Sequence, residues 1–165
     1  GTESEYGNGI NNGGTFTLTS GAITAQNYYM NGINNIGTLN ITGGTVKVNG
    51  NYSNVIMNRG ILKATGGNII NNVGPAYGIN STSLSEMNID GLNLQGPNDG
   101  NTNYGIYNSG KGNITIGSAI IKGYNYSIWN NNVGKTEIND INTTGRIWNN
   151  STGELNILSG SVNIN

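Results

Sequence analysis

The sequence predicts an all-β fold: a single-stranded, right-handed parallel β-helix, or β-solenoid, of about seven coils with three short strands each. Three observations support this prediction. The composition opposes helix, one residue pattern recurs along the whole chain, and apolar and polar residues alternate within each recurrence. We expect residues 1–165 to form one parallel β-helix domain that is a fragment of a longer chain. Its right-handedness follows from the general rule for parallel crossovers.

The composition restricts the chain to β-structure. It contains 34 Asn and 28 Gly among 165 residues. Gly loses much backbone entropy in a helix, and Asn competes with the helix by hydrogen bonding to its own backbone. Disorder usually accompanies a high net charge and few β-branched residues, whereas this chain has a net charge of −1 and recurring Ile, Val, Thr and Tyr. Ordered β-structure is therefore the prediction.

Composition also restricts the partners. The chain has 7 basic residues in no cluster, so we expect no nucleic-acid binding. It has no Cys and no His, so a disulfide and a thiolate metal site are excluded, and we assign no metal-ligating residue and no cofactor. No apolar run approaches the roughly 20 residues of a membrane helix, and residues 1–3 lack a signal-peptide pattern. We therefore expect no membrane insertion.

One motif, an Ile followed two positions later by Asn and then by Gly, marks each coil. Successive anchor isoleucines are 23, 23, 23, 27, 22 and 19 residues apart, as expected for one coil per repeat. The anchors are Ile10, Ile33, Ile56, Ile79, Ile106, Ile128 and Ile147.

Three strands are expected in each coil. The first surrounds the anchor, and the second and third are exemplified by Thr38–Thr42 and Thr45–Val48. Gly-containing pairs, where the chain can turn sharply, separate the second strand from the third. These pairs are Ser20-Gly21, Gly43-Gly44, Gly66-Gly67, Asp90-Gly91 and Ser159-Gly160.

The coil at about residues 79–105 is irregular. It is longer than the others and carries Ser81 where they carry Asn, so we expect a loop bulge there. Glu86, Asp90 and Asp99 flank this coil, which leaves open whether it binds calcium. No run of the type D-x-[DN]-x-[DN]-G is present, and an ordinary polar loop is the favoured interpretation.

The Asn two residues after the anchor is predicted to face the interior. A buried amide is costly unless it is hydrogen bonded, and identical amides stacked along the axis can bond to one another. We therefore expect a structural asparagine ladder rather than a ligand site. Its members are Asn12, Asn35, Asn58, Asn108, Asn130 and Asn149.

The segment Gly37–Val46 (GTLNITGGTV) resembles the parallel β-helix repeat regions of bacterial cell-surface adhesin-like proteins. The resemblance extends over the whole chain and its motifs specify architecture rather than activity. It implies an extracellular or cell-surface protein used for attachment, spacing or contact with glycans.

Outward-facing aromatic residues are the best candidates for a binding site. The residue after the anchor should point outward, and the last three coils carry Tyr107, Trp129 and Trp148 there. A contiguous aromatic strip suits a sugar ring or the apolar surface of a partner. A second set of tyrosines precedes the anchors and is expected to form a structural corner stack. It comprises Tyr6, Tyr28, Tyr29, Tyr52, Tyr77, Tyr104 and Tyr126.

Catalysis is a minority hypothesis. Polysaccharide lyases and hydrolases share this fold but need clustered carboxylates. Glu137 and Glu154 could stack as outward neighbours on adjacent strands near Lys135 or Arg146. A solvated charged face is the favoured interpretation, and no catalytic residue is predicted.

The leading hypothesis is a non-enzymatic extracellular β-solenoid that acts as an adhesin stalk or a carbohydrate- or protein-binding module. Its partner would be a glycan or a host or neighbouring-cell protein. The alternative is a self-assembling structural protein that stacks end to end into filaments or a sheath, because neither end shows an obvious cap. A further alternative is a polysaccharide lyase or hydrolase.

Overall fold

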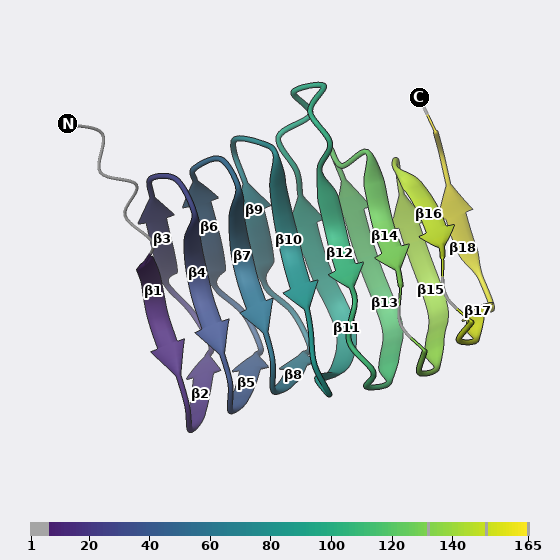
Figure 1. Cartoon of the computed structure of the whole chain (residues 1–165), viewed down its shortest axis with the longest axis horizontal. Coiled ribbons are helices and arrows are strands. Elements are labelled where there is room, and N and C mark those ends of the chain that lie inside the picture. The colour runs from purple at the N-terminus through teal and green to yellow at the C-terminus, as the bar shows by residue number, and fades with distance from the viewer. Residues whose placement is uncertain (1–6, 132, 151, 165) are drawn as a thin grey trace.

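The chain forms a β-solenoid of parallel strands (Figure 1). The structure is a computed structural model that describes residues 7–131, 133–150 and 152–164. The first strand of each coil descends on the near side in Figure 1, and the later strands return on the far side as the chain advances to the right. The solenoid is therefore right-handed, as predicted. No helix in the described part of the chain is long and apolar enough to cross a membrane.

A seven-stranded parallel sheet, here called the anchor sheet, takes one strand from each coil. Its register aligns all seven anchor isoleucines in one row, so the predicted repeat is confirmed. Its strands, in spatial order, are β1 (Gly7–Asn12), β4 (Met30–Asn35), β7 (Ser53–Asn58), β10 (Ala76–Ser81), β12 (Tyr104–Asn108), β14 (Tyr126–Asn130) and β16 (Arg146–Asn149).

The remaining strands form an eleven-stranded sheet. The first three coils and the last contribute two short strands each. These are β2 (Thr15–Leu18) and β3 (Ala22–Gln26), β5 (Thr38–Ile41) and β6 (Thr45–Asn49), β8 (Ile61–Ala64) and β9 (Asn68–Asn71), and β17 (Leu155–Ile157) and β18 (Gly160–Val162). The middle three coils contribute one long strand each, namely β11 (Glu86–Gln95), β13 (Ile114–Lys122) and β15 (Thr136–Thr143).

The prediction of three strands per coil is therefore correct for four coils and wrong for the middle three. β11 pairs with both β8 and β9, and its register against β13 shifts on either side of Asp90. A β-bulge absorbs an extra residue while the strand continues, so the corner bends without ending the strand.

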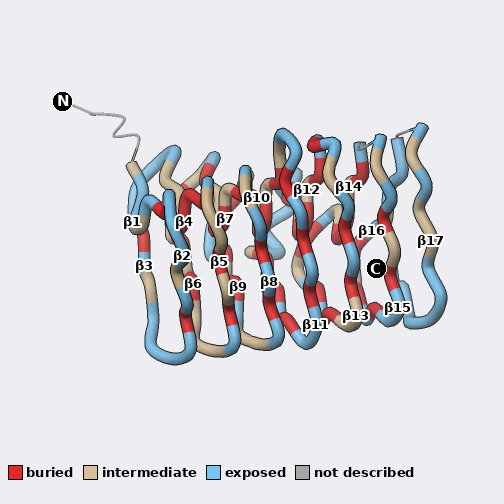
Figure 2. Tube along the Cα trace, turned by 90° about the horizontal axis from the view of Figure 1, so that it is seen from below, coloured by how far each residue is buried: buried red, intermediate tan, exposed pale blue. Residues whose placement is uncertain are grey.

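The core is a narrow apolar column along the axis. In the eleven-stranded sheet, buried inward-facing residues alternate with partly or fully exposed neighbours, as the alternating colours in Figure 2 show. In the anchor sheet, two successive residues such as Val55 and Ile56 are both buried. Ile33, Leu39 and Val46, one from each strand of the second coil, are all 0% exposed. Each coil thus buries its side chains chiefly against its two neighbouring coils.

The asparagine ladder is present, in two segments. In the first, the Asn12 Nδ2 donates to Asn35 Oδ1 and the Asn35 Nδ2 donates to Asn58 Oδ1, both at 2.8 Å. In the second, Asn108 donates to Asn130 and Asn130 to Asn149 at 3.0 and 2.8 Å. Ser81 occupies the intervening position, and its hydroxyl instead lies 2.5 Å from that of Ser85. Asn149, on the last coil, is exposed.

A loop at residues 96–103 joins β11 to β12 and extends beyond the corners of the adjacent coils (Figure 1). The Asp99 carboxylate accepts hydrogen bonds from the backbone N–H groups of Gly74 and Asn101 and from the Asn103 Nδ2, at 2.8, 3.0 and 2.8 Å. Burial acts to raise the pKa of Asp99, but these hydrogen bonds outweigh it and lower the pKa to about 2. Asp99 therefore fastens the loop to the preceding coil.

Candidate functional site

The outer face of the anchor sheet carries two parallel columns of side chains. The parallel register places Tyr77, Tyr104, Tyr126 and Arg146 in one column. Tyr107, Trp129 and Trp148 form the second, as the sequence predicted from their position after the anchor. The surface made by these six rings is called the aromatic face below.

Within each column the rings stack. Ring centroids are 5.1 Å apart for Tyr77 and Tyr104, 5.4 Å for Tyr104 and Tyr126, and 5.5 Å for Trp129 and Trp148, with interplanar angles of 8°, 14° and 15°. These distances are close to the roughly 4.8 Å between adjacent strands, so the backbone spacing sets the stacking.

Between the columns the rings meet edge to face. Tyr126 and Trp129 are the closest pair, with centroids 4.8 Å apart and planes 82° apart. Tyr104 makes the same kind of contact with Tyr107 and Trp129, at 5.3 and 5.7 Å. Both geometries are favourable for aromatic quadrupoles. The six rings therefore form one continuous surface rather than two separate strips.

Sequence reasoning missed half of this surface. It assigned Tyr77, Tyr104 and Tyr126 to a structural corner stack, whereas they lie beside the tryptophans. These tyrosines do stack on one another, and Tyr29 and Tyr52 form a separate stack with centroids 5.4 Å apart. Tyr6 lies outside the described residues. The three-residue spacing between Tyr104 and Tyr107, and between Tyr126 and Trp129, was the available signal, because two consecutive buried residues separate the partly exposed rings of each pair.

The N-terminal half of the same sheet is polar. Asn31 and Asn54 continue the tyrosine column, and each donates to the preceding coil, at 2.7 and 2.8 Å. The seven strands of the anchor sheet contain no Asp or Glu, and Arg146 is the only charged residue within them. The aromatic face is thus bordered by amides at one end and by a guanidinium group at the other.

The C-terminal end of the aromatic face is its most accessible part. Trp148 is 46% exposed, whereas the other five rings are partly buried by one another. The Arg146 Cζ lies 5.9 Å from the Tyr126 ring centroid, within the range of a cation–π contact.

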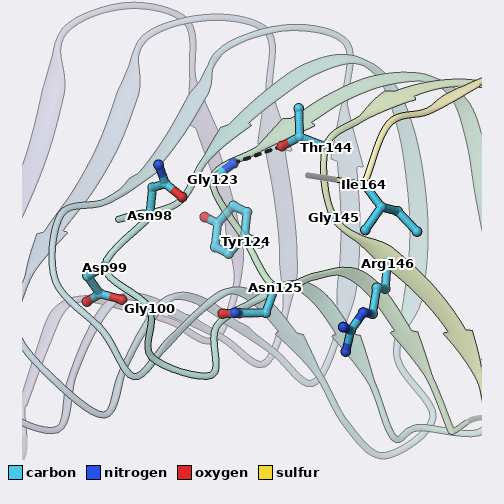
Figure 3. Close-up of a pocket in the computed structure, with 10 residues that line it drawn as sticks. All are labelled: Asn98, Asp99, Gly100, Gly123, Tyr124, Asn125, Thr144, Gly145, Arg146 and Ile164. Atoms are coloured by element: carbon cyan, nitrogen blue, oxygen red, sulfur yellow. Dashed lines mark hydrogen bonds between the residues drawn. The ribbon is translucent and has the colours of Figure 1, made fainter.

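A polar groove of about 210 Å³ lies beside this end, above the corner where β13 turns into β14 and β15 into β16 (Figure 3). Its lining includes the polar residues Asn98, Asn125, Thr144 and Arg146, together with Asp99, Tyr124 and the apolar Ile164. The Thr144 Oγ1 accepts a hydrogen bond from the Gly123 backbone N–H at 3.3 Å. Arg146 therefore belongs to both the groove and the aromatic face.

The buried Tyr124 fixes the corner beneath the groove. Its hydroxyl donates to the Asn71 Oδ1 at 2.8 Å and lies 3.2 Å from the Gln95 carbonyl oxygen, so one side chain connects three coils. Burial raises the pKa of Tyr124 far above its ordinary value, so the hydroxyl remains a donor.

The carboxylates do not form a site in the described part of the chain. Glu137 pairs across the strands with Asn156, not with Glu154, so the minority hypothesis that the two glutamates stack directly is wrong. Lys135 and Glu137 form an exposed ion pair at 2.7 Å. Of the residues flanking the fourth coil, Asp90 bonds to Ser118 at 2.7 Å, and no group of three or more His, Cys, Asp or Glu among the described residues could hold a metal ion.

Comparisons with protein-family models, curated proteins and solved structures found no match to this chain.

Proposed function

We propose that this chain is a non-enzymatic, extracellular or cell-surface β-solenoid that binds a carbohydrate or protein partner through the aromatic face. The observation that supports this proposal is the set of six contiguous rings on one side of the solenoid. Aromatic side chains supply large contact areas with little conformational entropy to lose, which makes them effective in recognition.

The remainder of the solenoid suits the role of a rigid stalk. Parallel pairing repeats from the first coil to the last, and the two segments of the asparagine ladder link the first three coils and the last three to one another. Such a scaffold holds the aromatic face in place along the axis, as expected of the adhesin-like repeat regions that the sequence resembles.

The test is a binding screen of the chain against glycans and matrix proteins, followed by Trp129→Ala and Trp148→Ala. Truncating a central interface tryptophan costs about 2 kcal/mol or more, so affinity should fall about thirtyfold or more. Tyr28→Ala is the control, because Tyr28 is 55% exposed and lies outside the aromatic face. Wild-type affinity in both tryptophan variants would overturn the proposal, and products formed from pooled polysaccharides would overturn its non-enzymatic part.

A second candidate function is end-to-end self-association into filaments. The last coil exposes apolar side chains, including Ile157, Leu158 and Ile164, at 44%, 69% and 63%. A further coil stacked there, from a continuing chain or a second molecule, would cover them. Electron microscopy of the purified chain at high concentration tests this candidate, and dispersed monomers would count against it.

A further inference from the structure

The groove in Figure 3 offers several kinds of hydrogen-bonding group within a small space. Asn98 and Asn125 provide amides that both donate and accept, Thr144 provides a hydroxyl, and Arg146 provides a planar set of donors. Asn98 and Asn125 are exposed at the groove. Ligand sites typically combine a concave shape with a few such convergent polar groups.

The groove is also held in a fixed shape. The Asn98 backbone N–H donates to the Gly123 carbonyl oxygen at 3.1 Å, which ties the loop to the next coil. The Asn125 Oδ1 accepts from the Asn103 N–H at 2.9 Å. Since Asp99 and Tyr124 secure the same corner, its polar groups are pre-positioned, and a ligand loses less entropy on binding.

The groove adjoins the aromatic face at Arg146, which lines the groove and also lies against Tyr126. The arginine stands over the ring of Tyr126, next to Trp148 on the same strand. A ligand that occupies the groove can therefore continue onto the aromatic rings. Its chemistry must combine hydroxyl-rich edges for the groove with an apolar face for the rings, which is the chemistry of a sugar.

The charges favour a neutral sugar. Arg146 contributes one positive charge to the groove and Asp99 contributes one negative charge, since its pKa is about 2. The Asp99 oxygens already accept three N–H groups, so this carboxylate orders the loop and adds repulsion toward anionic ligands.

We propose that this groove is a saccharide subsite that binds one neutral hexose unit with vicinal hydroxyls, and that Arg146 and Asn98 determine its specificity. The neighbouring units of the same glycan lie along the aromatic face. The subsite rests on the proposed function, because it names the ligand class of that binding surface.

The experiment titrates the full chain with linear neutral oligosaccharides of glucose, mannose, galactose and N-acetylglucosamine, using calorimetry. Arg146→Gln and Asn98→Gly each remove one groove contact. Glycine at 98 tolerates the positive φ of 48° found there. Affinity should fall about fivefold to tenfold in each variant, as expected for the loss of one or two hydrogen bonds.

Two matched controls are available. Arg59→Gln removes the arginine beside the polar half of the anchor sheet, which bonds to Asn34 at 2.9 Å. Asn27→Gly removes another exposed asparagine with positive φ, 103°, at a distant corner. Both should bind as the wild type does, and the oligosaccharide should shift the side-chain amide resonances of Asn98 and Asn125.

The outcomes separate the two proposals. Oligosaccharide binding that depends on Trp129 and Trp148 but changes less than about twofold in both groove variants would overturn the subsite and leave the aromatic face intact. Binding that none of the four variants weakens would overturn both. If no oligosaccharide binds, the subsite is wrong, and the proposed function then requires a protein ligand whose affinity falls in the tryptophan variants.

Discussion

Asparagine serves two purposes on the two faces of the anchor sheet. Inside, Asn35 is 0% exposed and donates toward the C-terminus, to Asn58. Outside, Asn31 is partly exposed and donates toward the N-terminus, to Asn8. The inner row was predictable because strand periodicity placed an amide in the core, where it must be bonded. The outer row carried no such burial signal, although Asn8, Asn31 and Asn54 recur at the coil spacing.

Asn35→Ala should lower the free energy of unfolding by about 2–4 kcal/mol. The change removes the acceptor of the Asn12 amide and the donor to both Asn58 Oδ1 and the Ile61 carbonyl oxygen, so three polar groups lose a partner. Urea denaturation measures the effect. Asn88→Ala, at an exposed position of β11, should change stability by less than about 0.5 kcal/mol. Equal effects of the two substitutions would mean that the inner ladder adds no stability.

At the scale of strands, the corner glycines mark where the chain bends but not whether a strand ends. Gly44 and Gly91 have nearly the same φ, 77° and 79°. The corner at Gly44 nevertheless separates β5 from β6, while β11 continues through Gly91. The difference lies in the pairing of each strand with its neighbours, which depends on register across coils. Local sequence could therefore predict the corner but not the continuous strand.

Gly37→Ala should destabilise the solenoid by about 1–3 kcal/mol, the usual cost of overpacking. A Cβ at Gly37 would lie 2.1 Å from the Gly14 carbonyl oxygen of the preceding coil. Gly14 is the equivalent residue of the first coil, and a Cβ there meets no atom within 4 Å. Gly14→Ala is thus the matched control and should leave the thermal midpoint unchanged or slightly raised. Similar midpoints for the two variants would contradict close coil spacing at this corner.

The tyrosine column predicts a loss of stability at alkaline pH. Burial, followed by the nearby tyrosines, raises the pKa of Tyr77 and Tyr104 above 10.0. A folded pKa above the unfolded value means that this stabilisation is fully present below pH 10 and is lost as the pH rises through the folded pKa. Absorbance titration at alkaline pH should show these tyrosines ionising later than in urea. Tyr77→Phe should remove part of that late phase, and identical titrations of the folded and denatured chain would contradict the prediction.

At the scale of the whole molecule, the coils interact mainly with their nearest neighbours, so stability should be close to a sum of local terms. The asparagine ladder illustrates these local interactions. Each of its hydrogen bonds joins adjacent coils, and Ser81 divides it into two separate hydrogen-bonded segments. The polar and aromatic halves of the anchor sheet meet at the same coil, where Tyr77 follows Asn54 in the register. The fourth coil therefore marks a boundary between two halves, which the sequence showed only as an irregular repeat.

A double-mutant cycle tests this boundary. Asn35→Ala and Asn58→Ala remove opposite ends of one hydrogen bond, so their effects on the free energy of unfolding should be non-additive, by about 0.5–3 kcal/mol. Asn35→Ala and Asn130→Ala act on different segments, on either side of Ser81, and their effects should add to within about 0.5 kcal/mol. Urea denaturation of the single and double variants supplies both couplings. Asn35, Asn58 and Asn130 are all buried members of the same predicted row. Equal coupling in the two pairs would therefore show that the two ladder segments are energetically coupled across the fourth coil, although Ser81 replaces Asn there.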